Sequence, residues 1–369
     1  MNSETIYIII LLFLCADFIF ERFLEGLNIR AMSPVLPEKL KGIYDEKEYK
    51  RFQSYKKENN RFGLISSAFS FTVTVLFLAA GGFGLYNDWI VSRTDSILWQ
   101  TLFFMLGLSV VSTLLEMPFS WYATFRIEEK YGFNKSTLNT WITDAVKGVF
   151  LSLIIGGLIL SAVVGFYLWT GSRFWIYAWV LISLFSIFMA MFYSRLIVPL
   201  FNKQSPLQAG SLRDKIEAFA SRTGFRLKNI YVIDGSKRST KANAYFTGLG
   251  AEKRIILYDT LLQDLTEEEI VAVLAHEIGH YRKKHTLKFM SASILQTGFM
   301  LWLFSLLVNI QAFSEALGSD RAYFQLGLVT FAILYSPVSM LLGICMNIWS
   351  RKNEYEADAF AVAAASSAG

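Results

Sequence analysis

The sequence predicts a multi-pass α-helical membrane protein that also carries one small α+β domain outside the membrane. Hydrophobic residues make up 54% of the 369 residues and charged residues only 18%, with a mean hydropathy of +0.40. Soluble proteins of ordinary composition carry about 25% charged residues. The apolar residues are also grouped into long runs that polar stretches separate. We therefore expect lipid to surround much of the chain.

Seven apolar stretches are long enough to cross a bilayer, which takes about 20 helical residues. They run over Thr5–Phe23, Phe62–Tyr86, Ile97–Tyr122, Val146–Trp169, Phe174–Leu196, Phe289–Ala312 and Phe324–Trp349. The first begins close to the N-terminus, where a signal peptide would also lie. Asp17 and Glu21 interrupt its end and no small-residue cleavage site follows, so we expect it to remain as the first of seven transmembrane helices.

The basic residues predict how these helices cross the membrane. Lys and Arg are concentrated after the first, third and seventh stretches, whereas the alternate connections hold only Arg93, Arg173 and Arg321. Because Lys and Arg accumulate on the cytoplasmic side, we expect an N-terminus that is outside or lumenal and a cytoplasmic C-terminus. The net charge of +5 is then explained by the lipid bilayer, and no nucleic acid partner is expected.

The stretch 201–288, between the fifth and sixth apolar stretches, has the composition of a globular domain, and the charge rule places it in the cytoplasm. Amphipathic spacing predicts a helix over Ser211–Ser221. Two β-branched runs, Asn229–Asp234 and Arg254–Asp259, predict strands, with Gly235–Thr240 and Asn243–Gly250 between them. This alternation predicts a small α+β fold.

A capping box predicts where the next helix begins. Thr266 is followed three residues later by Glu269, so each side chain can bond the other residue's backbone N–H. The helix that begins there is expected to reach at least His280.

The sequence H-E-I-G-H at 276–280 lies on this helix. His276 and His280 are four residues apart, so both imidazoles lie on one face and can bind a single Zn²⁺. Glu277 can then hydrogen-bond the metal's water and take its proton. A chance match is the alternative, with odds of about one in a thousand for a chain with three histidines. We therefore predict one Zn²⁺ per chain, with Glu277 as the catalytic base.

The third metal ligand is expected to be a carboxylate on the segment that follows the seventh stretch. In R-K-N-E-Y-E-A-D, residues 351–358, Glu354 and Asp358 share a helix face while Glu356 points away. Histidines that bind zinc usually donate their other ring N–H to a carboxylate. Glu354 as a ligand, with Asp358 accepting a hydrogen bond from a ligand histidine, fits this arrangement. An acidic helix end that balances Arg351 and Lys352 is the alternative. His285 is another candidate for the third ligand, but nine residues after His276 it lies about half a turn from the metal face of an α-helix. We therefore expect His285 to be a polar residue at the end of the helix.

The sequence N-A-Y-F at 243–246 precedes the zinc helix and lies between the two predicted strands. In a protease, an edge strand can pair with the extended backbone of the substrate. Asn243 and the backbone of Ala244 are then the candidates for substrate binding. An ordinary half-buried strand is an equally good interpretation.

These residues belong to a set of motifs through which the chain resembles the CAAX prenyl protease type 1 family, over most of its length. The motifs are P-F-S-W-Y-A-T-F-R-I-E-E-K-Y-G-F-N-K at 118–135, I-V-P-L-F-N-K at 197–203, D-G-S-K-R-S at 234–239, N-A-Y-F-T-G at 243–248, H-E-I-G-H, and E-Y-E-A-D-A-F-A at 354–361. Members of this family have seven transmembrane helices around a large intramembrane chamber, with the zinc site at its cytoplasmic end. The resemblance therefore implies a gluzincin-like zinc protease domain.

The resemblance also implies roles for particular residues. It implies Glu354 as the third zinc ligand, Glu277 as the base and Asn243 in substrate binding, and it implies that Arg238 meets a carboxylate at the substrate's C-terminus. Relatives continue for several tens of residues with a His and an Arg, so we expect the tail here to be truncated. The expected organisation is 1–200 for helices one to five with their loops, 201–288 for the protease domain, 289–350 for helices six and seven, and 351–369 for the third-ligand helix and tail.

The predicted activity is hydrolysis of peptide bonds near the C-terminus of prenylated (CAAX) or hydrophobic proteins, without a covalent intermediate. A general quality-control protease for membrane proteins would use the same site residues. A non-catalytic seven-helix receptor or transporter is the alternative from another class. A receptor does not need H-E-x-x-H, however, and a transporter is expected to show repeated halves with broken helices, which the sequence lacks. A scaffold that keeps zinc without catalysis is disfavoured by Glu277.

Overall fold

The computed structural model describes residues 2–225, 227, 229–248 and 253–366. The chain packs into two compact units, each built from three separate segments. The first unit holds Met1–Asn134, Leu151–Trp175 and Trp302–Leu341, and the second holds Lys135–Phe150, Ile176–Leu301 and Leu342–Gly369. The predicted boundaries at residues 200, 288 and 350 separate segments inside the membrane from segments outside it, whereas the two units are defined by packing. The predicted division therefore stays a prediction. Leu249 and Gly250 of a predicted connection and the last three residues of the tail lie outside the described residues.

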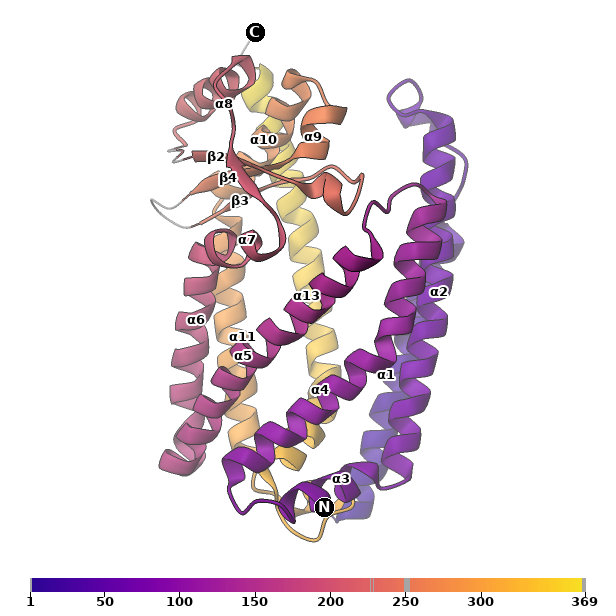
Figure 1. Ribbon diagram of the computed structural model, residues 1–369, viewed down its shortest axis with the longest axis vertical. Coiled ribbons are helices and arrows are strands. Elements are labelled where there is room, and N and C mark those ends of the chain that lie inside the picture. Colours follow the sequence, from indigo (N-terminus) through magenta and orange to yellow (C-terminus); the bar gives the residue numbers. More distant parts are fainter. Residues whose placement is uncertain (1, 226, 228, 249–252, 367–369) are drawn as a thin grey trace. The chain divides into compact units, whose positions relative to one another are not determined.

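Long helices make up most of the described chain (Figure 1). They are α1 (Ser3–Ala31), α2 (Glu46–Ala79), α4 (Ile97–Tyr122), α5 (Leu138–Thr170), α6 (Phe174–Leu196), α11 (His285–Leu307) and α13 (Phe324–Ser366). In the described part of the chain, six stretches of helix are long and apolar enough to cross a membrane. The stretch Leu138–Phe201 contains both α5 and α6, which the 3₁₀ turn η3 (Gly171–Arg173) joins. Each of the seven predicted segments therefore overlaps one of these helices.

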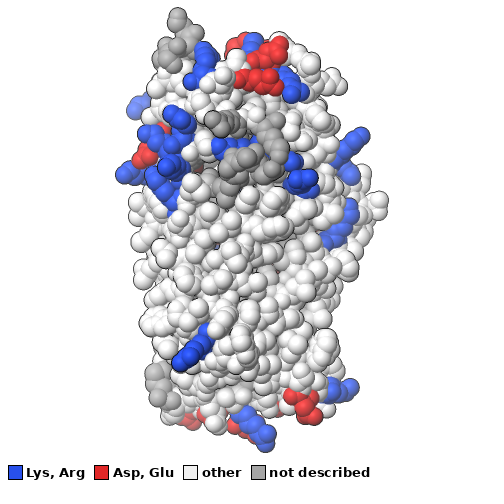
Figure 2. Space-filling model, turned by 90° about the vertical axis from the view of Figure 1, so that its left-hand side faces the viewer, with Lys and Arg blue, Asp and Glu red and all other residues white. Residues whose placement is uncertain are grey.

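The helices differ from the predicted segments at their ends. The predicted segment Phe62–Tyr86 is broken, because α2 ends at Ala79 and Gly81 takes a left-handed φ of 67° before α3 (Gly82–Val91) begins. At its other end α2 begins sixteen residues earlier, at Glu46, where the Asp45 side chain accepts a hydrogen bond from the Glu48 N–H. The predicted segments contain only the apolar part of each helix, because hydropathy defines them. The helix itself can continue into polar residues on either side. On the face drawn in Figure 2, a broad middle band is accordingly almost free of charged side chains.

The first unit has an apolar core formed by α1, the end of α2, α3, α4, α12 (Gln311–Glu315) and the start of α13. Its buried members include Ile10, Phe104 and Leu326. Gly84 lets α3 lie directly on the backbone at Gly318, because a Cβ at Gly84 would lie 2.3 Å from the Gly318 carbonyl oxygen. The same unit also contains η1 (Glu38–Leu40) and the π-helix η2 (Ala123–Glu128).

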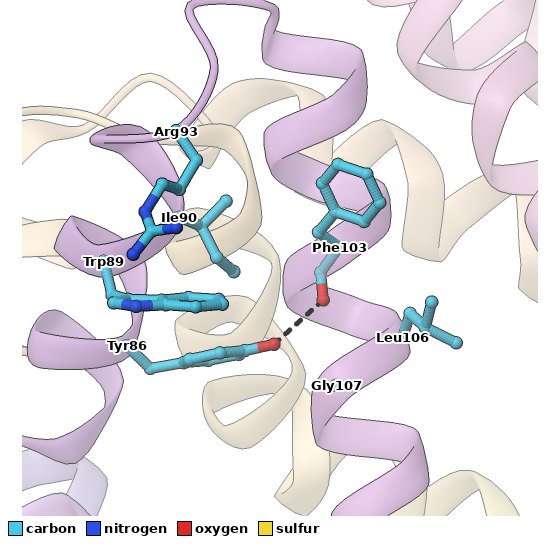
Figure 3. A pocket seen from close by; sticks show the side chains of 7 residues that line it. All are labelled: Tyr86, Trp89, Ile90, Arg93, Phe103, Leu106 and Gly107. Atoms are coloured by element: carbon cyan, nitrogen blue, oxygen red, sulfur yellow. Dashed lines mark hydrogen bonds between the residues drawn. The ribbon is translucent and has the colours of Figure 1, made fainter.

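Figure 3 shows an apolar pocket of about 350 Å³ between α3 and α4 in this unit. The Tyr86 hydroxyl crosses it to donate a 3.0 Å hydrogen bond to the Phe103 carbonyl, and the Arg93 guanidinium lies over the Trp89 ring. None of the seven residues that line it carries an imidazole, a thiol or a carboxylate. This pocket therefore has no group suited to metal binding or general-base chemistry.

The second unit contains a four-stranded sheet in the described residues, with strand order β1-β2-β4-β3. The strands are β1 (Gln204–Pro206), β2 (Asn229–Ile233), β3 (Ala244–Thr247) and β4 (Arg254–Tyr258). β2 and β4 are parallel, and β1 and β3 pair antiparallel with them at the two edges. β2 and β4 confirm the two predicted strands to within one residue, and β3 overlaps N-A-Y-F, beginning and ending one residue later. β1 was not predicted.

Helices cover one face of this sheet, as Figure 1 shows for α8 (Ser211–Arg222) and α10 (Glu267–Arg282). Strand residues point to alternate faces, so Ile255 and Leu257 of β4 pack with Ile216 and Leu274 of these helices, whereas Ile256 packs on the opposite face. The amphipathic helix predicted at Ser211–Ser221 is confirmed. The unit also contains α7 (Val198–Phe201), η4 (Gly235–Lys237) and α9 (Asp259–Asp264).

Candidate metal centre

Helix α10 brings two histidines onto one face. The predicted capping box is present: the Thr266 backbone N–H donates to the Glu269 carboxylate at 2.8 Å, and the Glu269 N–H donates to the Thr266 hydroxyl at 3.4 Å. From this start the helix runs unbroken through H-E-I-G-H. The Nε2 atoms of His276 and His280 lie 3.1 Å apart. Both imidazoles are about one-quarter exposed, so solvent and an ion can reach them.

Glu354 of α13 completes a triangle with these histidines. Its Oε2 lies 3.3 Å from His276 Nε2 and 3.5 Å from His280 Nε2. Three ligands at about 2.0–2.1 Å from a tetrahedral metal lie about 3.3–3.4 Å from one another. Among the described residues, these three side chains form a cluster whose ligand atoms all fall within 4.8 Å. The donor set of two imidazoles and one carboxylate, with these separations, therefore fits a metal such as Zn²⁺.

Asp358 lies one turn beyond Glu354 and contacts the other side of His276. Its Oδ1 is 2.7 Å from His276 Nδ1. A carboxylate here accepts the Nδ1–H proton and leaves the Nε2 lone pair facing Glu354 and His280. The structure thus places Asp358 where the sequence predicted a carboxylate that orients a ligand histidine.

Glu277 is half-buried beside the histidine pair. Burial raises the pKa of Glu277, and the nearby Glu354 charge raises it further, while His276 acts in the opposite direction. A raised pKa suits a carboxylate that takes up a proton during a reaction near neutral pH. Burial also lowers the pKa of His280, which favours the neutral imidazole that binds metals.

His285 differs from its predicted surroundings. Helix α10 ends at Arg282, Lys284 takes a left-handed φ of 58°, and His285 begins the next helix, α11. The helical phase of α10 therefore does not extend to it. His285 is 1% exposed, and its Nδ1 lies 3.1 Å from His280 Nδ1. Sequence reasoning missed this contact, and the only signal for it was a third histidine close to H-E-I-G-H.

The substrate-binding candidates Asn243 and Ala244 lie at a sheet edge. The Asn243 carbonyl accepts a hydrogen bond from the Tyr258 N–H at 3.0 Å. Because hydrogen-bonded pairs alternate along antiparallel strands, the peptide groups of Ala244 and Phe246 point away from β4. The Ala244 N–H donates to Asn243 Oδ1 at 2.9 Å. In the described residues β3 has a single strand neighbour, β4.

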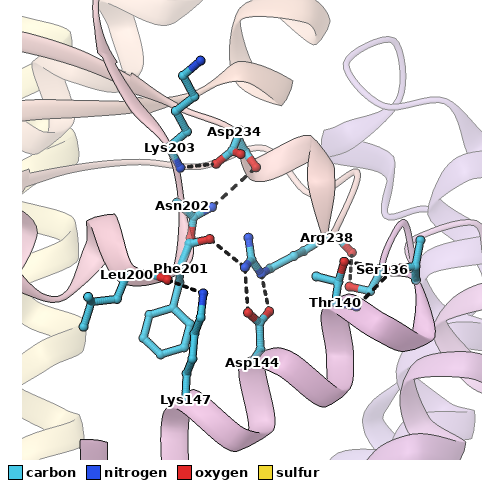
Figure 4. Close-up of polar contacts among 11 residues, drawn as sticks. Ser136, Thr140, Asp144, Lys147, Leu200, Phe201, Asn202, Lys203, Asp234 and Arg238 are labelled. Carbon is cyan, nitrogen blue, oxygen red and sulfur yellow. Dashed lines mark hydrogen bonds and ion pairs between the residues drawn. The ribbon is translucent and has the colours of Figure 1, made fainter.

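Arg238 is held by groups of its own unit (Figure 4). Its Nε and Nη2 donate to the Asp144 carboxylate at 2.6 and 2.9 Å, and Nη2 also donates to the Phe201 carbonyl at 2.7 Å. This arrangement ties the turn after β2 to α5 and α7. The predicted contact between Arg238 and a substrate carboxylate stays a prediction.

Comparison with known proteins gives consistent matches. Residues 27–203 match the family model described as CAAX prenyl protease N-terminal, five membrane helices, and residues 206–369 match peptidase family M48. The CAAX prenyl protease 1 homolog of Oryza sativa is 35% identical, covering 95% of this chain and 85% of the relative. CAAX prenyl protease 1 of Saccharomyces cerevisiae is 34% identical over 95% of this chain and 83% of its own length. The crystal structure of S. mikatae Ste24p matches with a TM-score of 0.90 and 34% identity, over 96% of this chain and 88% of that one.

The membrane-spanning helices, the α+β unit with its H-E-x-x-H helix and these matches define an integral membrane metallopeptidase. The chain belongs to the CAAX prenyl protease 1 family, within peptidase family M48. A multi-pass α-helical membrane protein with a small α+β peptidase domain is thereby confirmed, and so is the prediction of a metalloprotease.

Proposed function

We propose that the chain is a zinc endopeptidase in which His276, His280 and Glu354 hold one Zn²⁺. The observation that carries this assignment is the triangle of ligand atoms with edges of 3.1, 3.3 and 3.5 Å. When bound, zinc supplies a Lewis acid that lowers the pKa of a coordinated water to about 7. Asp358 holds His276 in the tautomer that presents Nε2 to the metal.

Glu277 is the general base in this proposal. Its carboxylate takes a proton from the attacking water and returns that proton to the nitrogen of the leaving amine as the peptide bond breaks. The half-buried position and raised pKa of Glu277 support both steps, because the protonated form is accessible in the folded protein. Water adds across the C–N bond, and no covalent enzyme intermediate is required.

The proposed substrate is the C-terminal segment of a prenylated (CAAX) or hydrophobic protein. The relatives that match over most of the chain are named CAAX prenyl proteases, and this class of substrate is proposed here by that relationship. We propose that the substrate's extended backbone pairs with the edge of β3 that faces away from β4, at Ala244, with Asn243 beside it. The peptide groups of Ala244 and Phe246, which point away from β4, support this pairing.

The proposed location of the active site is the cytoplasmic side of the membrane. The basic residues that flank alternate helices favour an outside or lumenal N-terminus. In this arrangement the sheet, α10 and the end of α13 lie in the cytoplasm, where a newly prenylated protein would meet them.

The first test compares wild type with Glu277→Gln for zinc content and for cleavage of a farnesylated CAAX peptide in detergent. We expect about one zinc per chain in both proteins and cleavage by wild type alone, because glutamine keeps the shape but cannot take a proton. Absence of zinc from both proteins would contradict the ligand assignment, and cleavage by Glu277→Gln would exclude Glu277 as the base. Equal cleavage of an unprenylated hydrophobic peptide would favour the broader quality-control activity.

A further inference from the structure

One buried histidine and one carboxylate near the metal centre have no role in the proposed chemistry. His285 lies under His280, with ring centroids 5.1 Å apart and an interplanar angle of 76°. On its other side, His285 Nε2 lies 3.3 Å from Glu356 Oε2 of α13. The two contacts use opposite nitrogens of His285, so the three side chains form a line that ends at the proposed ligand His280.

Hydrogen-bond chemistry allows one arrangement of protons along this line when His280 binds metal. His280 Nε2 faces His276 and Glu354, so its lone pair points to the metal and its proton is on Nδ1. The 3.1 Å contact then requires an acceptor at His285 Nδ1. A neutral imidazole with an acceptor at Nδ1 carries its proton on Nε2, and Glu356 accepts that proton. Every donor in the line therefore meets an acceptor.

We propose that His285 and Glu356 are positioning residues for metal binding, which hold His280 in the tautomer and orientation that present Nε2 to the metal. This inference rests on the proposed function, in which His280 is a ligand. The two ligand histidines are then supported differently: Asp358 contacts His276 directly at 2.7 Å, whereas Glu356 reaches His280 through His285.

The burial of His285 supports a role in positioning His280. His285 is 1% exposed, so water does not replace its bond to His280. Glu356 belongs to the same helix as Glu354, and His285 begins the helix that follows α10. The line therefore ties three helices of the second unit together at the metal centre, and removing its middle member would take away the acceptor of the His280 Nδ1–H.

The test measures metal affinity in full-length detergent-purified protein by competition with a chromophoric chelator, using Zn²⁺ and Co²⁺. The variants are His285→Ala, His285→Asn, Glu356→Gln and the double variant His285→Ala with Glu356→Gln. Glu217→Gln is the matched control, because Glu217 is an exposed carboxylate of α8 that pairs with Arg213. The visible spectrum of the Co²⁺ form reports the ligand geometry independently of peptide cleavage.

We expect His285→Ala to weaken metal binding by about 10–100-fold, the usual effect of removing such a supporting residue. Glu356→Gln should weaken it by a smaller factor, and the double variant should be no weaker than His285→Ala, because both act through one line. His285→Asn should regain part of the affinity, since Asn Oδ1 can accept the His280 proton where Nδ1 did. A role in packing alone would instead make the Asn and Ala variants equally weak.

Control-like affinity in His285→Ala, or losses that add in the double variant, would overturn the inference. If wild type holds stoichiometric metal and one of these two results is found, the proposed function stays intact and only this inference fails. Wild type without metal would instead refute the proposed function and this inference with it.

Discussion

Among single residues, Glu277 has a charge that the folded chain disfavours when no metal is bound. Burial raises its pKa above the ordinary value of 4.5, so the folded state binds the proton more tightly than the unfolded state. Stability then falls as pH rises from the unfolded pKa through the folded one. In chelator-treated protein we therefore expect Glu277→Gln to raise the unfolding temperature at pH 7 and to leave it unchanged at pH 4. Differential scanning fluorimetry at the two pH values measures this.

Glu268 on the same helix provides a control of opposite sign. Lys215 lowers the pKa of Glu268 through a 2.6 Å hydrogen bond, so the charge of Glu268 favours the folded state above the unfolded pKa. Glu268→Gln should lower the unfolding temperature at pH 7, by a small amount because the pair is exposed. If Glu277→Gln also lowers the unfolding temperature at pH 7, the folded state does not disfavour the charge of Glu277.

At the level of secondary-structure elements, the close approach of α10 and α13 at Gly279 sets the position of Glu354. A Cβ at Gly279 would lie 3.0 Å from both the Cα and the carbonyl oxygen of Ala357. Gly279→Val should therefore separate the helices, lower stability by about 1–3 kcal/mol, and weaken metal binding because Glu354 lies one turn before Ala357. The gain in helix propensity, a few tenths of a kcal/mol, is too small to offset this.

The matched control for this prediction is Ala272→Val, on the exposed face of the same helix. It introduces the same side chain with only its small loss of helix propensity. Chemical unfolding and metal competition measure both effects. Wild-type metal affinity in Gly279→Val would show that contact at this glycine does not position the ligands.

The pair of Arg238 and Asp144 links another two elements, the turn after β2 and helix α5. Both side chains are about one-quarter exposed, and the guanidinium binds the carboxylate through two nitrogens. We expect Asp144→Asn to lower stability by about 1.5–3 kcal/mol, the range for hydrogen bonds to charged groups. The KM ratio for peptides ending in a carboxylate or an amide should stay unchanged. A changed ratio would instead support the predicted contact of Arg238 with the substrate's C-terminus.

For the whole molecule, the proposed orientation is testable by cysteine labelling. In a variant that lacks Cys15 and Cys345, a single cysteine replaces either Asp95 or Lys39, both of which are exposed. We expect an impermeant maleimide, added outside intact cells or on the lumenal side, to label Asp95→Cys. Lys39→Cys should be labelled only after permeabilisation, because basic connections lie in the cytoplasm. The reverse pattern would place the metal centre on the other side of the membrane.

Much of this protein could be predicted from local sequence patterns. Long apolar runs require helices in lipid, because backbone groups there have no water to bond. The i, i+4 spacing of His276 and His280 places two imidazoles on one helix face whatever the helix packs against. The capping box at Thr266 is equally local, and the structure confirms both the cap and the helix.

Only the tertiary structure decided which distant residues meet these local features. A strand as short as β1 has too few residues for a pattern, and its pairing with β2 depends on a segment 25 residues away. Ligand atoms of Glu354 and His276 come within 3.3 Å through the packing of α10 and α13, which no periodicity encodes. His285 shows the limit most clearly: the left-handed Lys284 ends the phase of α10, so the contact with His280 follows from the break between two helices and from burial rather than from spacing.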